Sequence, residues 1–118
     1  MLPVMVTESG VLIIRLRADL DIAGRAAAAW AIDGFLAAHQ SSPVVLELSD
    51  APVSAAAVST IVRAHRMCGY ADVPLAVVAS NADARRTLAG IAAVETVDVH
   101  PARAQAVAKL SAALAAAA

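Results

Sequence analysis

The sequence predicts an α/β fold in which helices alternate with the strands of a mostly parallel sheet. Three observations lead to this prediction. The stretch 44–66 passes from an apolar strand pattern through a polar loop into a helical pattern. Strand and helix patterns follow one another in the order β-β-α-β-α-β-α-β-α, which is typical of parallel sheets with right-handed crossovers. A length of 118 residues suits a single domain spanning 1–118, with one hydrophobic core.

A hairpin is expected at the N-terminus. Val4, Val6 and the apolar run 11–16 have strand character, and the turn-rich triplet 8–10 separates them. The hairpin makes the first strand pair antiparallel, so we expect a central mixed, mostly parallel sheet of four to five strands, with about four helices.

The first helix is predicted over 22–39, with Asp21 as its N-cap and with the Asp21 charge complementing the helix dipole. Trp30 falls beside the expected core face, so we expect it to be half-buried. The apolar residues that form this core face are Ala28, Ala29, Ile32, Phe35 and Leu36.

The stretch 44–66 is the predicted centre of the fold. Residues 44–48 make an apolar run interrupted only by Glu47, which suits a central strand covered on both faces. Ser54 is the expected N-cap of the following helix. The buried stripe of this helix is predicted to contain Val58, Ile61, Val62 and His65, with Ser59, Arg63 and Arg66 on the other side. The loop lies at the carboxyl end of a central strand, where open α/β sheets bind their ligands.

The C-terminal part supplies two more strands and two more helices. We expect a strand over 75–79 and a helix over 82–89, capped by Ser80 or Asn81 and stopped by Gly90. A last strand is expected over 96–99, and Pro101 suits the first position of the final helix. An exposed apolar face on that helix would favour a homodimer.

Composition excludes several classes of protein. A net charge of -1 disfavours nucleic acid or an anionic membrane as the main partner. No apolar run reaches the roughly 18 residues of a membrane-spanning helix, and residues 1–9 lack the features of a signal peptide, so we expect a cytoplasmic location. The single cysteine, Cys68, cannot form an internal disulfide and is expected to be buried.

Enzyme chemistry is not expected. The sequence has no glycine-rich phosphate loop, no pattern of metal ligands, and no indication of a cofactor. Its three histidines are far apart in the predicted fold, and Ser54 lacks the surroundings of a nucleophile elbow. A compact binding module is therefore the expected class.

The chain from about Gly10 to Leu114 resembles a STAS domain of the bacterial anti-sigma factor antagonist (anti-anti-sigma) type. The segments that carry the resemblance are Ala18-Asp19-Leu20-Asp21, Val45-Leu46-Glu47-Leu48-Ser49, the helix ending Arg63-Ala64-His65-Arg66, the short helix with Arg85-Arg86, and Leu88-Ala89-Gly90-Ile91. The resemblance implies a protein that docks on an anti-sigma factor, an ATPase-type serine kinase, to control sigma-factor-dependent transcription.

In that family a serine in a D-S-S-G-L motif is phosphorylated by the partner kinase. Here the loop is about one residue short, and Ser54-Ala55-Ala56-Ala57-Val58 stands in place of the motif. Alanine therefore occupies the acceptor position and cannot carry phosphate. The docking surface implied by the resemblance comprises the loop and first turn over 49–59 and the adjacent helix face, with Asp21, Asp50, Ser54, Ala56, Ser59, Arg63 and Arg66 as partner-binding residues.

Two interpretations of the switch remain open. The preferred one is a module that binds its partner without phosphorylation, because capping is a sufficient structural role for Ser54. In the other, Ser54 is a displaced phosphate acceptor. An alternative function is a STAS-like domain that senses a small molecule or nucleotide within a signalling complex.

Overall fold

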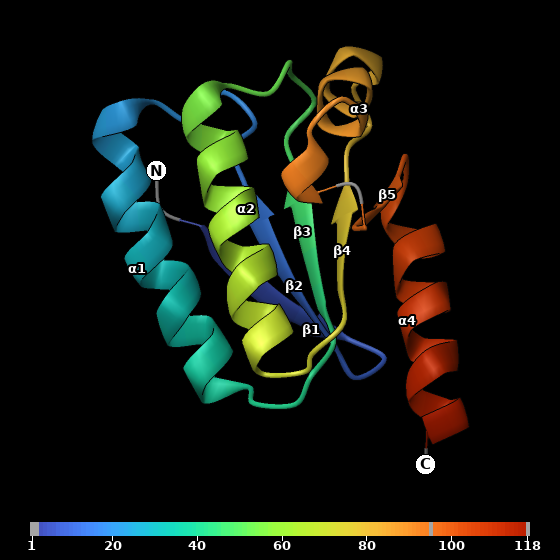
Figure 1. The fold of residues 1–118 in the computed structure, drawn as a ribbon. Coiled ribbons are helices and arrows are strands. Elements are labelled where there is room, and N and C mark those ends of the chain that lie inside the picture. Colours follow the sequence, from blue (N-terminus) through green and yellow to red (C-terminus); the bar gives the residue numbers. More distant parts are fainter. Residues whose placement is uncertain (1–2, 95, 118) are drawn as a thin grey trace.

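Five strands form one sheet in the chain order β1-β2-β3-β4-β5 (Figure 1). The β1–β2 pair is antiparallel and the three following pairs are parallel, which confirms the predicted mixed α/β fold. This computed structural model describes residues 3–94 and 96–117. The elements are β1 (Val4–Glu8), β2 (Val11–Leu16), α1 (Ile22–Ala38), β3 (Val44–Leu48), α2 (Ala55–Tyr70), β4 (Leu75–Val78), α3 (Ala82–Ala89), the short 3-10 helix η1 (Ala92–Val94), β5 (Asp98–His100) and α4 (Arg103–Ala117).

The predicted N-terminal hairpin is confirmed and has a two-residue turn. Glu8 pairs with Val11, and between them Ser9 and Gly10 both have positive φ, at 54° and 80°. Positive φ at both central positions is characteristic of the hairpin turn whose twist matches that of the strands. A Cβ added to Gly10 would lie 3.2 Å from Leu114 on α4, so this turn also allows the close approach of the last helix.

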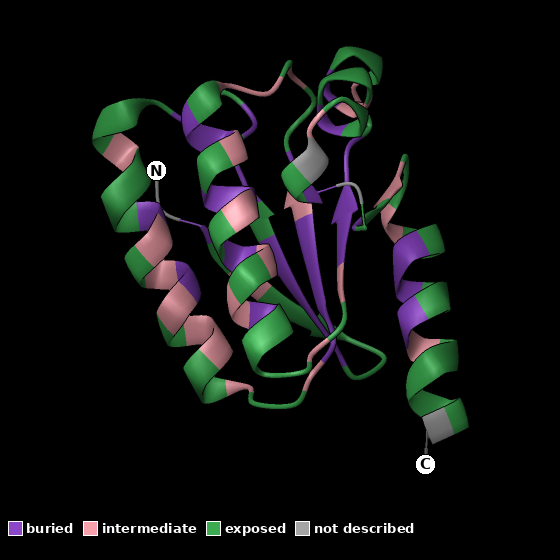
Figure 2. Ribbon diagram, in the orientation of Figure 1, coloured by how far each residue is buried: buried purple, intermediate pink, exposed green. Residues whose placement is uncertain are grey.

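Helices cover both faces of the sheet, and the central strands are accordingly buried along most of their length (Figure 2). Successive side chains of a strand point to opposite faces, so the two faces have separate cores. The larger core joins one face of the sheet to α1, α2 and α3. The smaller core lies on the opposite face, where α4 contributes its only three buried residues among those that the structure describes. These are Ala106, Val107 and Leu110, which pack on Val11, Ile13, Val45, Ala76 and Val78.

Glu47, the one charged residue in the central strand, has a structural partner. Arg103 at the start of α4 donates two hydrogen bonds to its carboxylate, at 2.5 and 2.9 Å. Arg15 on the neighbouring strand lies 3.6 Å away. These charges lower the pKa of Glu47, chiefly through the hydrogen bonds from Arg103, so the carboxylate stays ionised beside the small core.

The structure corrects four details of the expected elements. Trp30 is 79% exposed rather than half-buried, because it lies on the side of α1 opposite the sheet. The last strand spans Asp98–His100, and α4 begins at Arg103, two residues after Pro101. The fourth correction concerns α2, whose buried face is rotated from the predicted stripe by about 110°, close to a third of a turn. Its buried residues are Ala56, Ala57, Thr60, Ile61, Ala64 and Cys68.

Of the predicted stripe on α2, only Ile61 is fully buried. Val58 and Val62 pack at the edge of the core, and His65 is partly exposed, with its Nε2 atom 3.3 Å from Thr96 Oγ1. The alanines of α2 bring the helix close to the sheet, whereas the prediction gave more weight to its larger side chains. In the described part of the chain, no helix has both the length and the apolar character needed to cross a membrane.

Candidate functional site

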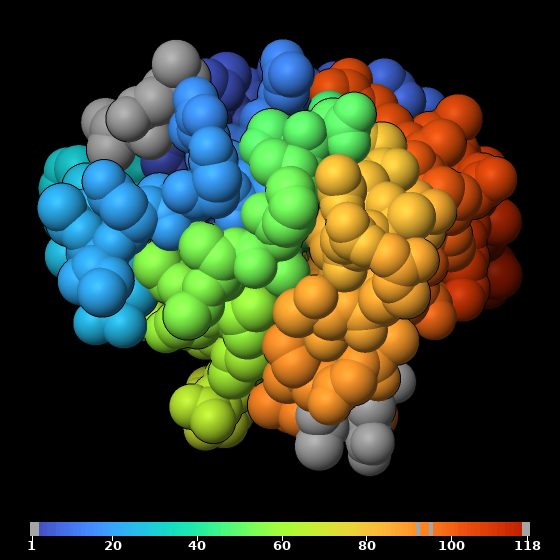
Figure 3. Space-filling model, turned by 90° about the horizontal axis from the view of Figure 1, so that it is seen from above, coloured from blue at the N-terminus to red at the C-terminus, as the bar shows by residue number. Residues whose placement is uncertain are grey.

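The candidate docking surface lies at the edge of the sheet where the parallel strands β2, β3 and β4 end. Three loops, 17–21, 49–54 and 79–81, leave the strands there and lead into α1, α2 and α3. Figure 3 looks down on this edge and shows the green loop 49–54 with the first turn of α2 between the blue start of α1 and the gold α3. The loop that the sequence singled out is therefore central on this side of the molecule.

Ser54 caps α2, as predicted, and also joins two of these loops. Its hydroxyl oxygen accepts a hydrogen bond from the Ala57 amide at 3.1 Å, and the hydroxyl donates one to the Leu20 carbonyl oxygen at 2.5 Å. Its own amide donates to the Ala18 carbonyl oxygen at 2.8 Å. The hydroxyl proton of Ser54 is thus already engaged within the protein.

Ser49 joins the same two loops from the other side. Its hydroxyl oxygen accepts a hydrogen bond from the Ala18 amide at 2.9 Å, and its amide donates to the Leu16 carbonyl oxygen at 3.1 Å. With the two bonds of Ser54, three hydrogen bonds hold the loops 17–21 and 49–54 together, and the bond to Leu16 joins the loop 49–54 to the end of β2. A surface fixed in this way loses little conformational entropy when a partner binds.

The two predicted aspartates of the site are exposed. Asp21 caps α1, as expected, and accepts a hydrogen bond from the Gly24 amide at 2.7 Å. Asp50 accepts a long hydrogen bond, 3.4 Å, from the side chain of Asn81, the N-cap of α3. Asp50 therefore connects the central loop to the third helix and leaves much of its carboxylate open to solvent.

Ser59, Arg63 and Arg66 form an exposed stripe along α2. Arg63 donates two hydrogen bonds, at 2.5 and 2.8 Å, to Asp33 on α1, and these bonds raise the pKa of the Arg63 guanidinium. A partner that binds Arg63 must therefore compete with Asp33 or contact both side chains together.

Ala56 is not available on this surface. It is only 4% exposed and belongs to the larger core, so the expectation that it contacts a partner is wrong. Its neighbour Ala55 is exposed instead. The reason is the rotation of α2, which turns position 56 inward.

Two arginines at the rim of the docking surface have hydrogen-bond partners within the protein. Arg17 donates two hydrogen bonds to Asp19, at 2.9 and 3.0 Å, and thereby lowers the pKa of that exposed carboxyl. Arg85 donates to the carbonyl oxygens of Ala79 and Ser80 at 2.8 and 2.9 Å, which fixes the loop before α3. This geometry favours recognition by shape and local charge over attraction of a highly charged partner.

Among the described residues of this edge there is neither a candidate metal site nor a serine hydroxyl paired with a basic side chain. In residues 3–94 and 96–117, no three His, Cys, Asp or Glu side chains gather in a way that could hold a metal ion. The hydroxyls of Ser49 and Ser54 are hydrogen-bonded to backbone groups rather than to a base. The surface is suited to contact another molecule.

Sequence reasoning missed two contacts of the site. The acceptor of the Ser54 hydroxyl, the Leu20 carbonyl oxygen, lies 34 residues earlier in the chain, and no side-chain pattern marks a backbone acceptor. The partner of Arg63, Asp33, is 30 residues away. The sequence contains one indication of this pairing, namely that Asp33 is the one acidic residue in an alanine-rich helix.

Comparisons with known proteins agree with this geometry. The family model described as "STAS domain" matches residues 3–106. A solved structure described as an anti-sigma factor antagonist from Mycobacterium paratuberculosis has a TM-score of 0.76 and 17% sequence identity, and the match covers 92% of each chain. At this level of identity the likeness establishes a shared fold. A comparison with curated proteins found no significant match.

Proposed function

The chain belongs to the STAS-domain family, and we propose that it is a regulatory protein-interaction module that acts as an anti-sigma factor antagonist. In this proposal it docks on an anti-sigma factor, an ATPase-type serine kinase, and so controls sigma-factor-dependent transcription in a bacterial cytoplasm. The surface that docks is the loop and first turn over 49–59 with the exposed stripe of α2. The protein itself carries out no catalysis.

The observation that carries the proposal is the rigid surface formed around Ser54. Three hydrogen bonds join its loops 17–21 and 49–54, and a fourth connects the docking loop to the end of β2. A partner can contact three exposed polar groups on this surface: the hydroxyl of Ser59, the carboxylate of Asp50 and the guanidinium of Arg66.

The same hydrogen bonds support docking without a phosphorylation switch. Transfer of phosphate to Ser54 would replace the hydroxyl proton that now binds the Leu20 carbonyl oxygen. It would also place a charge of about -1.5 to -2 next to that carbonyl oxygen. Because the residue is partly buried and both of its bonds would change, Ser54 is a poor acceptor in the folded protein.

The first experiment identifies the partner. The tagged protein is used to capture binding proteins from the cytosol of its host, and the retained proteins and the intact mass of the bait are measured by mass spectrometry. We expect an ATPase-type kinase to be retained while the bait keeps its unmodified mass after incubation with ATP. An added phosphate that is lost in Ser54→Ala would contradict the absence of a switch, and failure to retain any such kinase would contradict the proposed partner.

The second experiment tests the surface with a matched pair of variants. Ser59→Arg adds one positive charge to the proposed docking stripe, and Gln105→Arg adds the same charge to an exposed position of α4 on the other side of the sheet. We expect Ser59→Arg to weaken binding of the purified kinase at least tenfold and Gln105→Arg to leave it unchanged. Equal affinities of the two variants would place the docking surface elsewhere.

A further inference from the structure

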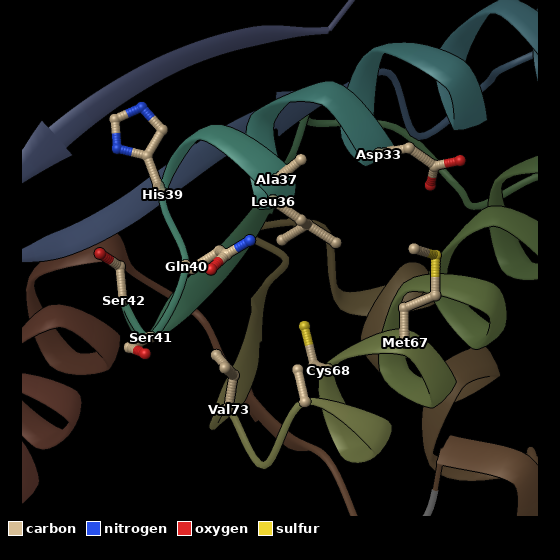
Figure 4. Close-up of a pocket in the computed structure, with 11 residues that line it drawn as sticks. Asp33, Leu36, Ala37, His39, Gln40, Ser41, Ser42, Met67, Cys68 and Val73 are labelled. Atoms are coloured by element: carbon tan, nitrogen blue, oxygen red, sulfur yellow. The ribbon is translucent and has the colours of Figure 1, made fainter.

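A cleft lies between the C-terminal ends of α1 and α2, at the opposite end of the molecule from the loop 49–54 (Figure 4). Its volume is about 360 Å³, which falls in the range of pockets that hold small molecules. The loops that follow the two helices complete it. The residues that line this cleft are Asp33, Leu36, Ala37, His39, Gln40, Ser41, Ser42, Met67, Cys68, Ala71 and Val73.

The inner wall of the cleft is apolar. Leu36 from α1 and Cys68 from α2 point toward one another across it, with Met67 and Val73 beside them (Figure 4). Leu36 and Val73 pack against the large core and are only partly buried. The inner wall can therefore contact a compact apolar group, and packing against the core holds the wall in place.

The rim of the cleft is rich in hydrogen-bond acceptors that have no partner. In residues 3–94 and 96–117, the side chains of Gln40, Ser41 and Ser42 make no hydrogen bond. Nor does any backbone amide of this described part, outside the regular helices and strands, donate to the carbonyl oxygens of Leu36 or Ala37, in the last turn of α1. These oxygens are free to bind a donor.

The charge of the cleft favours a cation. The C-terminal end of α1 lies there with carbonyl oxygens that are unpaired within the described part of the chain, and such a helix end carries about half of a negative charge. The last carbonyl oxygens of α2 instead accept hydrogen bonds from the amides of residues 71–73. The lining contains no lysine or arginine, and His39 is its one basic side chain. Its one carboxylate, Asp33, is bound by Arg63, so the end of α1 and the neutral oxygens of the rim provide the attraction.

We propose that this cleft binds a small organic ammonium ion with a compact apolar body. The ammonium group donates hydrogen bonds to the free oxygens of the rim, and the apolar body lies on Leu36, Cys68 and Val73. The cleft adjoins the docking surface at Asp33, which lines the cleft and is bound by Arg63 of the exposed stripe on α2. Binding in the cleft would give the protein a ligand-sensing role beside its proposed docking on a partner protein.

The test uses three probes that share one apolar ring and differ in their polar group. Cyclohexylamine, cyclohexanol and cyclohexanecarboxylate are each titrated into the ¹⁵N-labelled protein at pH 7, and the backbone amide resonances are followed by NMR. We expect cyclohexylamine to cause saturable shifts at residues 40–42 and 71–73, cyclohexanol to bind at least tenfold more weakly, and the carboxylate not to bind. No saturable shift with the amine, or equal affinities for the three probes, would overturn the proposal.

Two neighbouring alanines provide the matched variants. Ala37 and Ala38 are both exposed on the last turn of α1, but only Ala37 lines the cleft. Ala37→Trp should block the cleft and lower the affinity for cyclohexylamine at least tenfold, whereas Ala38→Trp should leave it unchanged. Gln40→Lys, which places a positive charge at the rim, should also lower this affinity. Unaltered binding by Ala37→Trp and Gln40→Lys would show that the amine binds outside the cleft.

Discussion

The Ser54 hydroxyl donates a hydrogen bond to the Leu20 carbonyl oxygen across 2.5 Å while it accepts one from the Ala57 amide. One side chain thus caps α2 and fixes the loop that precedes α1. The cap satisfies an amide that the first turn of a helix leaves unpaired. The second bond is one of three that join the loops 17–21 and 49–54.

Ser54→Ala should lower the free energy of unfolding by about 1–3 kcal/mol, because both the cap and the donor to Leu20 are lost. Urea unfolding monitored by circular dichroism measures this change. Ser59→Ala is the control, since Ser59 is exposed on the same helix, and it should change stability by less than about 0.5 kcal/mol. Ser54→Asp retains a capping acceptor but no donor, and its stability should lie between those of wild type and Ser54→Ala. If Ser54→Ala and Ser59→Ala unfold at the same urea concentration, the double role of Ser54 is wrong.

Ala56→Leu should destabilise the protein by about 1–3 kcal/mol, because position 56 is 4% exposed and has no room for three further carbon atoms. Ala55→Leu is the matched control. Ala55 is exposed one residue earlier in the first turn of α2, and there the larger side chain should change stability by less than about 0.5 kcal/mol. Thermal unfolding of the two variants distinguishes the buried position from the exposed one. Equal melting temperatures would contradict the orientation of α2.

Most of the fold could be predicted because its signals are local. The apolar run 44–48, the turn at 8–10 and the capping residues Asp21 and Ser54 each act through neighbours in the sequence. The orientation of α2 could not be predicted in this way. Large side chains mark one face of this helix, but Ala57 and Ala64 face the sheet, because small residues there allow closer packing than larger ones.

The candidate site could be located but not described in detail from the sequence. Its position follows from the loop after the central strand and from the family resemblance. Its rigidity depends on backbone amide and carbonyl groups of residues 16–20, which meet Ser49 and Ser54 only in the folded chain. Likewise, the pairing of Arg63 with Asp33 depends on how α1 and α2 pack together. Contacts between distant segments leave no periodic pattern in the sequence.

Stability should depend on pH through Glu47. The hydrogen bonds from Arg103 lower the pKa of Glu47 in the folded protein, whereas an unfolded chain has a glutamate pKa of about 4.3. A lowered folded pKa stabilises the protein above that value, and the contribution is lost as the pH falls through the folded pKa. Glu47→Gln should therefore cost about 1–3 kcal/mol at pH 7, and the difference from wild type should shrink towards pH 3.

Urea unfolding between pH 3 and pH 7 tests this dependence on Glu47. Asp19→Asn is the comparison, because Asp19 is also paired with an arginine but both partners are exposed. Water screens such a pair, so this variant should alter the pH dependence much less than Glu47→Gln does. A constant difference between Glu47→Gln and wild type over the whole range would show that the ion pair is not the source of the effect.

The thiol of Cys68 should react slowly in the folded protein for two reasons. Cys68 is 2% exposed, and burial raises its pKa to about 11, whereas a cysteine in an unfolded chain has a pKa of about 8.5. At pH 8 about one thiol in a thousand is then ionised in the folded state, against about one in four in the unfolded state. We expect a disulfide reagent to label the native protein at least about 100-fold more slowly than the protein in 8 M urea. The native rate should also keep rising with pH beyond 9, where the unfolded rate levels off. Because the chain has one cysteine, every labelling event reports this site, and a native rate within tenfold of the unfolded rate would contradict the burial of Cys68 beneath the cleft.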